Sequence, residues 1–361
     1  MRKLIIILLA LTLALGACST ARQKLTPQGN VNFKTAQVYY AQKNVEKAEE
    51  FYNKVLADNP DHALSMRRMA DINLYKGENN PAKTVEYNKA AYELYDKAIT
   101  AYGAYLNPTD EEKMDIRDMK RRRDSAWVRV YSAAEKAQTD GNTQQAMEIF
   151  ELAAKLDGSR PEPIIRLKDI YQKDLKDPGK AENMLKQLLA KDPDNQAYIL
   201  ETGAFYFNQE NYAEAAKYFE RSKTINPSDM DNLLNLSFAY YELKDYDKAL
   251  AETKLALALD PTNLEILDNA KNIALMKEDK QLAISYLEQL IELRSTEEDF
   301  NEISVLLNDV KDYGKLITYA KKWHEWDDTN KYAVQFIVLA AQMTGDAALQ
   351  KTYSDILKTM P

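Results

Sequence analysis

Apolar and small residues recur with a fixed period of 34 positions between residues 195 and 261. A proline closes each period, and proline ends a helix because it lacks an amide hydrogen and clashes with the preceding turn. A period of this length predicts a stack of helical hairpins. No alternation of apolar and polar residues typical of a β-strand recurs along the chain. The repeated pairs are Tyr206 and Tyr240, Tyr212 and Tyr246, Ala215 and Ala249, and Pro227 and Pro261.

The same pattern extends in both directions and predicts about nine hairpins. Residues 161–361 follow it regularly, with one extra residue expected in the turn near Pro178 and Gly179. Residues 31–160 form a divergent N-terminal part with longer helices. Each hairpin covers only part of its apolar surface, so stacking on its neighbours is expected to provide most of the stability.

The divergent part is the least regular. We expect a helix at residues 63–76, a turn at 77–81, and a long helix from about 82 to 106. Thr109 is a suitable N-cap for a second long helix that runs to about residue 139. The register of residues 77–130 stays open.

This pattern resembles the tetratricopeptide repeat family. The resemblance rests on small residues where two helices approach closely, such as Ala215 and Ala249, and on large residues between hairpins, such as Tyr206 and Tyr240. It covers nearly all of residues 31–361. It implies an all-α solenoid in a right-handed superhelix, in which the first helix of each hairpin lines an inner groove.

The resemblance also places residues of the fifth to seventh repeats in that groove. Phe207, Phe238 and Tyr241 would form an aromatic strip that could hold a peptide or a helix. The alternative is that Phe238 and Tyr241 simply pack between adjacent repeats. The family's Lys and Asn clamp for a C-terminal carboxylate is not matched, since Leu200, Leu234 and Asp268 stand at the Lys position. The expected groove residues are Leu200, Phe207, Asn208, Leu234, Asn235, Phe238, Tyr241, Asn269 and Asn272.

Residues 1–17 have the features of a secretory signal, with two basic residues followed by an apolar run. The run is too short to span a membrane, which takes about 20 apolar residues. Leu15-Gly16-Ala17-Cys18 resembles the lipobox of bacterial lipoproteins. That resemblance implies cleavage before Cys18, acylation of its sulfur and its amine, and, because Ser19 follows, the outer membrane. The alternative is an ordinary signal with a chance cysteine. Residues 18–30 are expected to be a polar tether.

Composition narrows the functional classes. The chain carries 48 basic and 56 acidic residues, and loss of residues 1–17 would change the net charge from −8 to −10, which argues against nucleic acid as a partner. His62 and His324 lie far apart and form no metal motif, and 10 scattered glycines form no phosphate loop. We therefore expect no enzyme activity, no catalytic residues, no metal and no cofactor.

The run Lys120-Arg121-Arg122-Arg123 is the densest basic segment. It could bind anionic lipid headgroups or an acidic partner. The favoured interpretation is a solvated helix face, because four consecutive residues spread around a helix and Asp118 stands four residues before Arg122.

These observations predict a scaffold that is lipid-anchored in the cell envelope, faces the periplasm and binds a protein or peptide, as a component of an assembly or secretion complex. The alternative is a factor that binds cell-wall polysaccharide, with the aromatic strip stacked on sugar rings. The sequence alone indicates neither the partner nor the oligomeric state.

Overall fold

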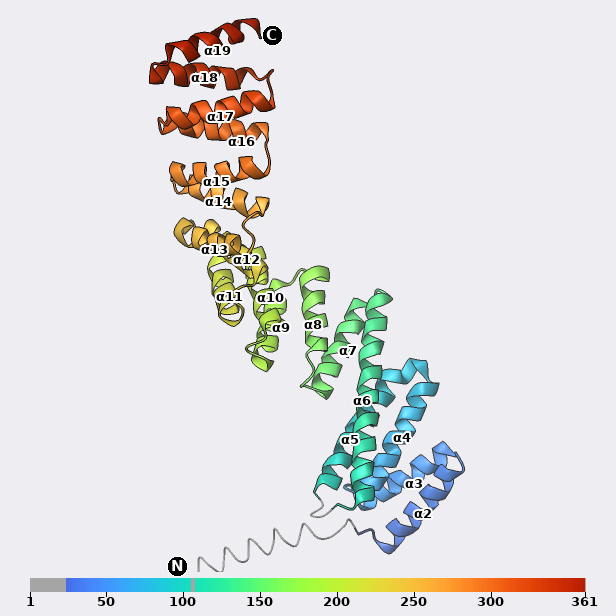
Figure 1. Cartoon of the computed structure of the whole chain (residues 1–361). Helices are drawn as coiled ribbons and strands as arrows, with labels where there is room; N and C mark the ends of the chain where they lie inside the picture. The colour runs from blue at the N-terminus through green and yellow to red at the C-terminus, as the bar shows by residue number, and fades with distance from the viewer. Residues whose placement is uncertain (1–23, 105–107, 361) are drawn as a thin grey trace, which may run out of the picture. The chain divides into compact units, whose positions relative to one another are not determined.

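The computed structural model describes residues 24–104 and 108–360. These residues form eighteen α-helices, α2–α19, together with a 3₁₀ turn and a π turn, and no strand among them (Figure 1). The helices pair consecutively into nine hairpins. The predicted all-α repeat array is therefore confirmed. None of the helices in this part of the chain is both long enough and apolar enough to cross a membrane.

The chain divides into two compact units, residues 1–191 and 192–361. The N-terminal unit holds four hairpins and the C-terminal unit holds five. The N-terminal helices are α2 (Pro27–Ala41), α3 (Val45–Asp58), α4 (Ala63–Asn79), α5 (Thr84–Gly103), α6 (Asp110–Thr139), α7 (Thr143–Leu156), α8 (Glu162–Asp169) and α9 (Pro178–Lys191).

The first helix, α2, begins earlier than the sequence pattern indicates. Proline suits the first turn of a helix, and Pro27 occupies it, while the Thr26 hydroxyl accepts a hydrogen bond from the Gly29 amide. The Thr26 hydroxyl also donates to the Asp58 carboxylate at 2.9 Å, which fixes this end of α2 against α3. Residues 27–30 of the expected tether are thus helical.

Helix α4 continues through the expected turn at Gly77. A Cβ atom at this position would lie 2.6 Å from the Asn88 side-chain nitrogen, so glycine allows α4 and α5 to approach closely. The chain turns only at Asn80, and Pro81 starts a single 3₁₀ turn before α5. Helix α6 begins with the capping box that Thr109 predicts, in which Thr109 and Glu112 cap each other's backbone amides.

The extra residue of the fourth repeat is taken up at a different place from the one expected. The last turn of its first helix is a π turn, Ile170–Asp174. A π turn widens the helix locally and so accommodates one added residue. The Leu175 amide then donates to the Ile170 carbonyl at 3.0 Å. The turn near Pro178 is therefore of ordinary length.

In the C-terminal unit, helices of 13 or 14 residues follow one another as five hairpins (Figure 1). Each turn inside a hairpin contains one residue with a left-handed backbone, and the first four are Glu210, Lys244, Glu278 and Lys311. Their spacing of 34, 34 and 33 residues shows that the repeat period sets the turn geometry. The helices are α10 (Gln196–Asn208), α11 (Tyr212–Ile225), α12 (Met230–Glu242), α13 (Tyr246–Leu259), α14 (Leu264–Met276), α15 (Lys280–Leu293), α16 (Glu297–Asp309), α17 (Tyr313–Trp326), α18 (Lys331–Thr344) and α19 (Ala347–Thr359).

One continuous apolar core runs through this unit, and small residues let its helices approach. Ala215 and Ala249 are completely buried, as their assignment to packing positions predicts. At Gly203 a Cβ atom would lie 2.6 Å from the ring of Phe219, so only glycine fits there without a shift of the ring. This core fixes the first helices relative to one another and so positions their solvent-exposed side chains.

Candidate functional site

The first helices of the C-terminal unit present one matched, solvent-exposed position in each repeat. We call this series the first-helix row. Its apolar members Phe238, Val305 and Leu339 are 40%, 43% and 37% exposed. Large side chains left this accessible at regular intervals form a surface suited to a partner. The row consists of Ala204, Phe238, Asn272, Val305 and Leu339.

A pocket of about 230 Å³ opens beside Phe238, between α12 and α14. We call it the Phe238 pocket. It brings together four of the nine residues that the sequence places in the groove, two aromatic and two amide. Ser237, Glu242 and Ile273 complete its lining. The four predicted residues are Phe238, Tyr241, Asn269 and Asn272.

Two predicted aromatic residues have a second role in packing. Phe207 lies edge-to-face against Tyr212, with ring centroids 5.1 Å apart, and Tyr241 lies against Tyr246 in the same way at 5.6 Å. The two contacts are one repeat apart and join the ends of each hairpin. Tyr241 is half-buried and lines the pocket, whereas Phe238 is exposed. Tyr241 therefore packs within its own hairpin, whereas Phe238 is 40% exposed.

The remaining predicted groove residues do not line the Phe238 pocket. Leu200 and Leu234 are half-buried and pack against core residues. Asn208 and Asn235 are exposed on α10 and α12. Val305 and Leu339 belong to the eighth and ninth repeats, beyond the groove predicted for repeats five to seven. The step of 33 or 34 residues from Phe238 and Asn272 would have found them.

Sequence models of a known repeat family match three segments of the chain. They are three models of the tetratricopeptide repeat, and they match residues 31–62, 171–230 and 206–273. The chain is a tetratricopeptide repeat protein. The first match falls on α2 and α3, and the third includes every residue of the Phe238 pocket. No curated protein sequence matches the chain.

Several solved structures resemble the tetratricopeptide array. MamA protein is 18% identical, with 46% of this chain and 91% of MamA covered and a TM-score of 0.40. PilF of Pseudomonas aeruginosa is 17% identical, with 62% and 98% covered and a TM-score of 0.37. YrrB, described as a TPR protein with an unusual peptide-binding site, is 17% identical, with 51% and 91% covered and a TM-score of 0.40.

Tetratricopeptide arrays form extended binding surfaces, and such proteins generally act as scaffolds for protein–protein interaction without catalysing reactions. Across residues 24–104 and 108–360, no group of three His, Cys, Asp or Glu side chains could hold a metal ion. His62 has a structural part, because its Nδ1 atom caps α4 by accepting from the Ser65 amide at 3.3 Å. Burial lowers the pKa of His62. A lower pKa favours the neutral ring, which can accept that hydrogen bond.

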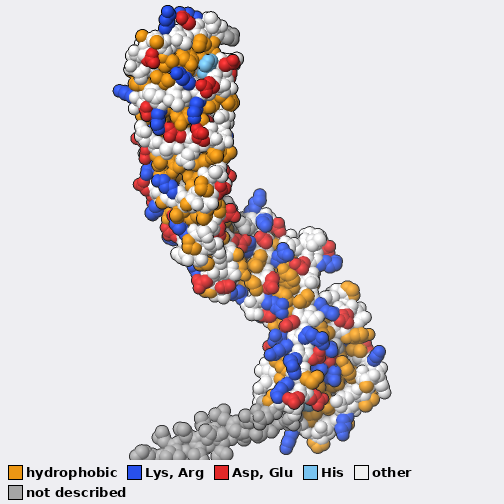
Figure 2. All heavy atoms as spheres, in the orientation of Figure 1, with side chains coloured by type: hydrophobic (Ala, Val, Ile, Leu, Met, Phe, Trp, Pro, Cys, Tyr) orange, Lys and Arg blue, Asp and Glu red, His pale blue; other side chains and the backbone are white. Residues whose placement is uncertain are grey.

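The basic run of α6 is largely occupied by ion pairs within the N-terminal unit. Arg122 binds Asp118 at 2.8 Å, the pair predicted from their spacing, and it also reaches Asp71 of α4 at 3.3 Å. Arg123 binds Asp96 of α5 at 2.8 Å. In Figure 2 the Lys and Arg side chains over α5–α7 lie among Asp and Glu side chains. The run therefore joins α6 to its neighbouring helices and is more than a solvated face.

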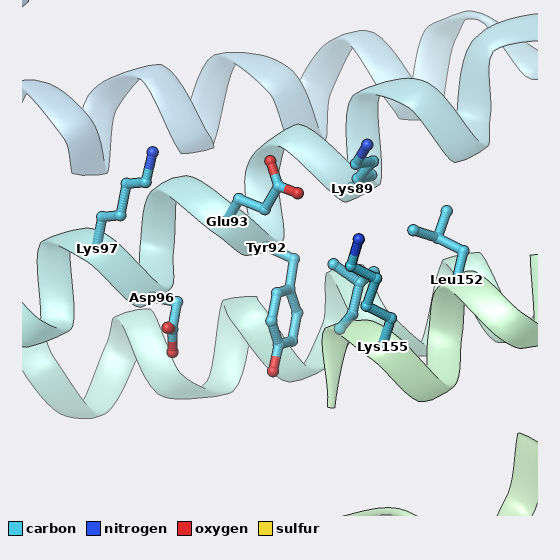
Figure 3. A pocket seen from close by; sticks show the side chains of 8 residues that line it. Lys89, Tyr92, Glu93, Asp96, Lys97, Leu152 and Lys155 are labelled. Carbon is cyan, nitrogen blue, oxygen red and sulfur yellow. The ribbon is translucent and has the colours of Figure 1, made fainter. Parts of the chain in front are cut away.

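A second hollow, of about 270 Å³, lies between α5 and α7 in the N-terminal unit. Figure 3 shows Lys89 and Lys155 reaching toward it from these two helices, beside Tyr92 and Leu152. Glu93, Asp96 and Lys97 also line it, so charges of both signs meet there. No residue predicted from the sequence to bind a partner lies in it.

Proposed function

We propose that this protein is a lipid-anchored scaffold of the bacterial envelope that holds an extended segment of a partner protein along the first helices of its C-terminal unit. The observation that carries the proposal is the Phe238 pocket within the first-helix row. Its exposed aromatic side chain offers an anchor for an apolar group, and Asn269 and Asn272 supply amide donors and acceptors for a peptide backbone. Periplasmic assembly or secretion complexes are the setting we propose for it.

Capture of a partner from envelope extract by the mature chain tests this proposal. Phe238→Ala combined with Asn272→Ala is expected to weaken capture at least about tenfold, because exposed aromatic anchors in a pocket are typical hot spots worth about 2 kcal/mol or more. Phe207 and Tyr241 are less suitable for this test, since both also pack inside their hairpins. The measurement is the amount of partner bound to the immobilised chain over a range of chain concentrations.

The matched control is Leu255→Ala, which removes an apolar side chain of similar exposure (43%) from a second helix, α13. It should leave capture unchanged. The proposal fails if the double variant captures the same protein as well as the native chain does. Retention on peptidoglycan or glycan beads that depends on Phe238 would favour the polysaccharide alternative instead.

The anchor is a separate part of the proposal and rests on Cys18, which lies outside the described residues. Cys18→Ser is expected to move the protein from the membrane fraction to the soluble fraction, because the hydroxyl cannot replace the thiol in acylation. Each buried CH₂ of an acyl chain contributes about 0.8 kcal/mol, so loss of the chains removes most of the membrane affinity. Ser19→Ala keeps the sulfur and should stay with the membranes. Sedimentation of Cys18→Ser with membranes would contradict the anchor.

A further inference from the structure

The two units differ strongly in charge. Residues 1–191 contain 31 Lys and Arg against 26 Asp and Glu, a net charge of +5. Residues 192–361 contain 17 against 30, a net charge of −13. Since the whole chain carries only −8, its acidity belongs to the unit that holds the Phe238 pocket. A field of one sign selects partners of the opposite sign and repels the others.

Within the C-terminal unit the basic residues avoid the first helices. Helices α10, α12, α14, α16 and α18 together hold ten Asp and Glu but only two Lys. Lys271 is one of the two, and it is 7% exposed and bound to Glu302 at 2.7 Å. Lys331 is the first residue of α18. All other Lys and Arg of the unit stand on second helices or in turns, so the first-helix face has almost no available positive charge.

Four carboxylates on these helices are exposed and have no ion pair or hydrogen bond within the described part of the chain: Asp231, Glu242, Glu265 and Glu298. Asp231, Glu265 and Glu298 lie in the first turns of their helices, where the helix dipole alone favours an acid. Glu242 is the last residue of α12, where the dipole disfavours a negative charge. It has no local stabilising partner, and it lines the Phe238 pocket.

The lining of the pocket suits a positively charged side chain. Glu242 offers a carboxylate, and the rings of Phe238 and Tyr241 offer faces that attract a cation. The amide oxygens of Asn269 and Asn272 can accept further hydrogen bonds from an ammonium or guanidinium group. No Lys or Arg lines the pocket, so an acidic side chain or a C-terminal carboxylate would meet repulsion without a matching cation.

We infer that the segment held along the first-helix row is cationic, an extended peptide stretch of a partner protein with a Lys or Arg side chain seated in the Phe238 pocket against Glu242. This inference rests on the proposed function, since it names the chemistry of the segment bound at the same site. Two charges support it: the Glu242 carboxylate in the pocket and the net charge of −13 on the C-terminal unit.

Three blocked synthetic peptides of equal length and equal apolar content, with Lys, Gln or Glu at the polar positions, test the inference by titration against the full mature chain. The Lys peptide is expected to bind at least about tenfold more tightly than the Glu peptide, because like charges oppose association. Glu242→Gln should weaken binding of the Lys peptide about fivefold, the effect of losing one exposed charge pair. Added salt should reduce that difference, because it screens exposed charges.

Glu325→Gln is the matched control. It removes the same charge from an exposed site on a second helix, α17. It should change binding of the Lys peptide far less than Glu242→Gln does. If both variants weaken binding equally, the net charge attracts the peptide without a site, and the inference is overturned.

The remaining outcomes separate this inference from the proposed function. If all three peptides bind equally and Phe238→Ala weakens all of them, the groove stands and the cationic preference is wrong. If Phe238→Ala leaves binding of the Lys peptide unchanged, the site itself is wrong. If the chain associates with itself and the Lys peptide dissociates it, the N-terminal unit of a second copy is the occupant, and the assignment to a partner protein is overturned.

Discussion

Asp71→Ala is expected to lower the free energy of unfolding of the N-terminal unit by about 3 kcal/mol, the lower part of the range for breaking a buried ion pair. The Asp71 side chain is 5% exposed. It accepts from the Tyr95 hydroxyl at 2.6 Å, from Arg68 at 3.2 Å and from Arg122 at 3.3 Å. Both arginines keep some access to water, so part of their hydration can be recovered.

In Asp71→Ala the buried Tyr95 hydroxyl loses its hydrogen-bond acceptor, and this loss accounts for most of the expected cost. Burial, together with the neighbouring Asp71 carboxylate, raises the pKa of Tyr95, so the hydroxyl stays protonated and needs an acceptor. Asp71→Asn keeps an amide oxygen as that acceptor and should cost less than Asp71→Ala. The exposed Asp61 provides a control, since Asp61→Ala should change stability by no more than about 0.5 kcal/mol.

Amide hydrogen exchange is the measurement, because a chain with two units need not unfold in one step. Protection should fall in α4, α5 and α6, the helices that Asp71 connects through Tyr95 and Arg122. Unchanged exchange in these helices would mean that their apolar packing alone sets the stability of this part of the unit.

The same network shows what the sequence could and could not indicate about charge. The pairing of Asp118 with Arg122 follows from a spacing of four residues on one helix. The pairing of Arg122 with Asp71 spans 51 residues and depends on how α4 and α6 dock. Sequence spacing carries no information about docking, so it predicts a solvated face where Arg122 and Arg123 form ion pairs with neighbouring helices.

The fold itself was predictable because its period is explicit. Prolines and paired aromatic residues 34 positions apart define the fifth and sixth hairpins without reference to any single helix, and the other hairpins follow by extending that period. The predictions of local structure were wrong where one sequence feature is compatible with two different structures. Gly77 resembles a turn residue, yet it lies inside α4 because its missing side chain lets Asn88 approach. The extra residue of the fourth repeat could be absorbed in a turn or in a helix, and the helix took it up as a π turn.

The sequence predicts which repeat positions face the groove, but it predicts less well which of their side chains are exposed to solvent. The repeat positions place Phe238, Tyr241, Asn269 and Asn272 on one face, and in the structure these four residues line one pocket. Register alone does not give exposure, which depends on the neighbouring side chains of each repeat. Tyr246 lies against the Tyr241 ring, whereas Phe238 is 40% exposed. Glu242 stands at a groove position of the sixth repeat, and its place at the end of α12 gains meaning beside the pocket that it lines.

Trp323→Ala is expected to cost the C-terminal unit about 3–5 kcal/mol, the usual effect of emptying a buried tryptophan site. Trp323 is 1% exposed and lies parallel to Phe300 of α16, with ring centroids 6.3 Å apart. Its ring is also 6.4 Å from that of Phe336 in α18. One side chain thus connects the eighth and ninth hairpins.

The chain provides its own control three residues further along α17. Trp326 is 50% exposed and contacts Phe300 only from outside, so Trp326→Ala should cost about 1 kcal/mol or less. Trp323→Phe should cost less than Trp323→Ala, because it keeps a ring and removes an indole N–H that has no hydrogen-bond partner in the described structure.

The helices in which Trp323→Ala lowers amide protection are more informative than the total loss of stability. Stability in a repeat array is close to a sum over neighbouring repeats. Trp323→Ala should therefore raise amide exchange in α16–α19, while α10–α13 keep their protection. The Phe238 pocket, formed by α12 and α14, should still bind the Lys peptide. Loss of protection throughout the unit would show instead that the five hairpins unfold as one cooperative body, so that a defect at one end would empty the binding site at the other.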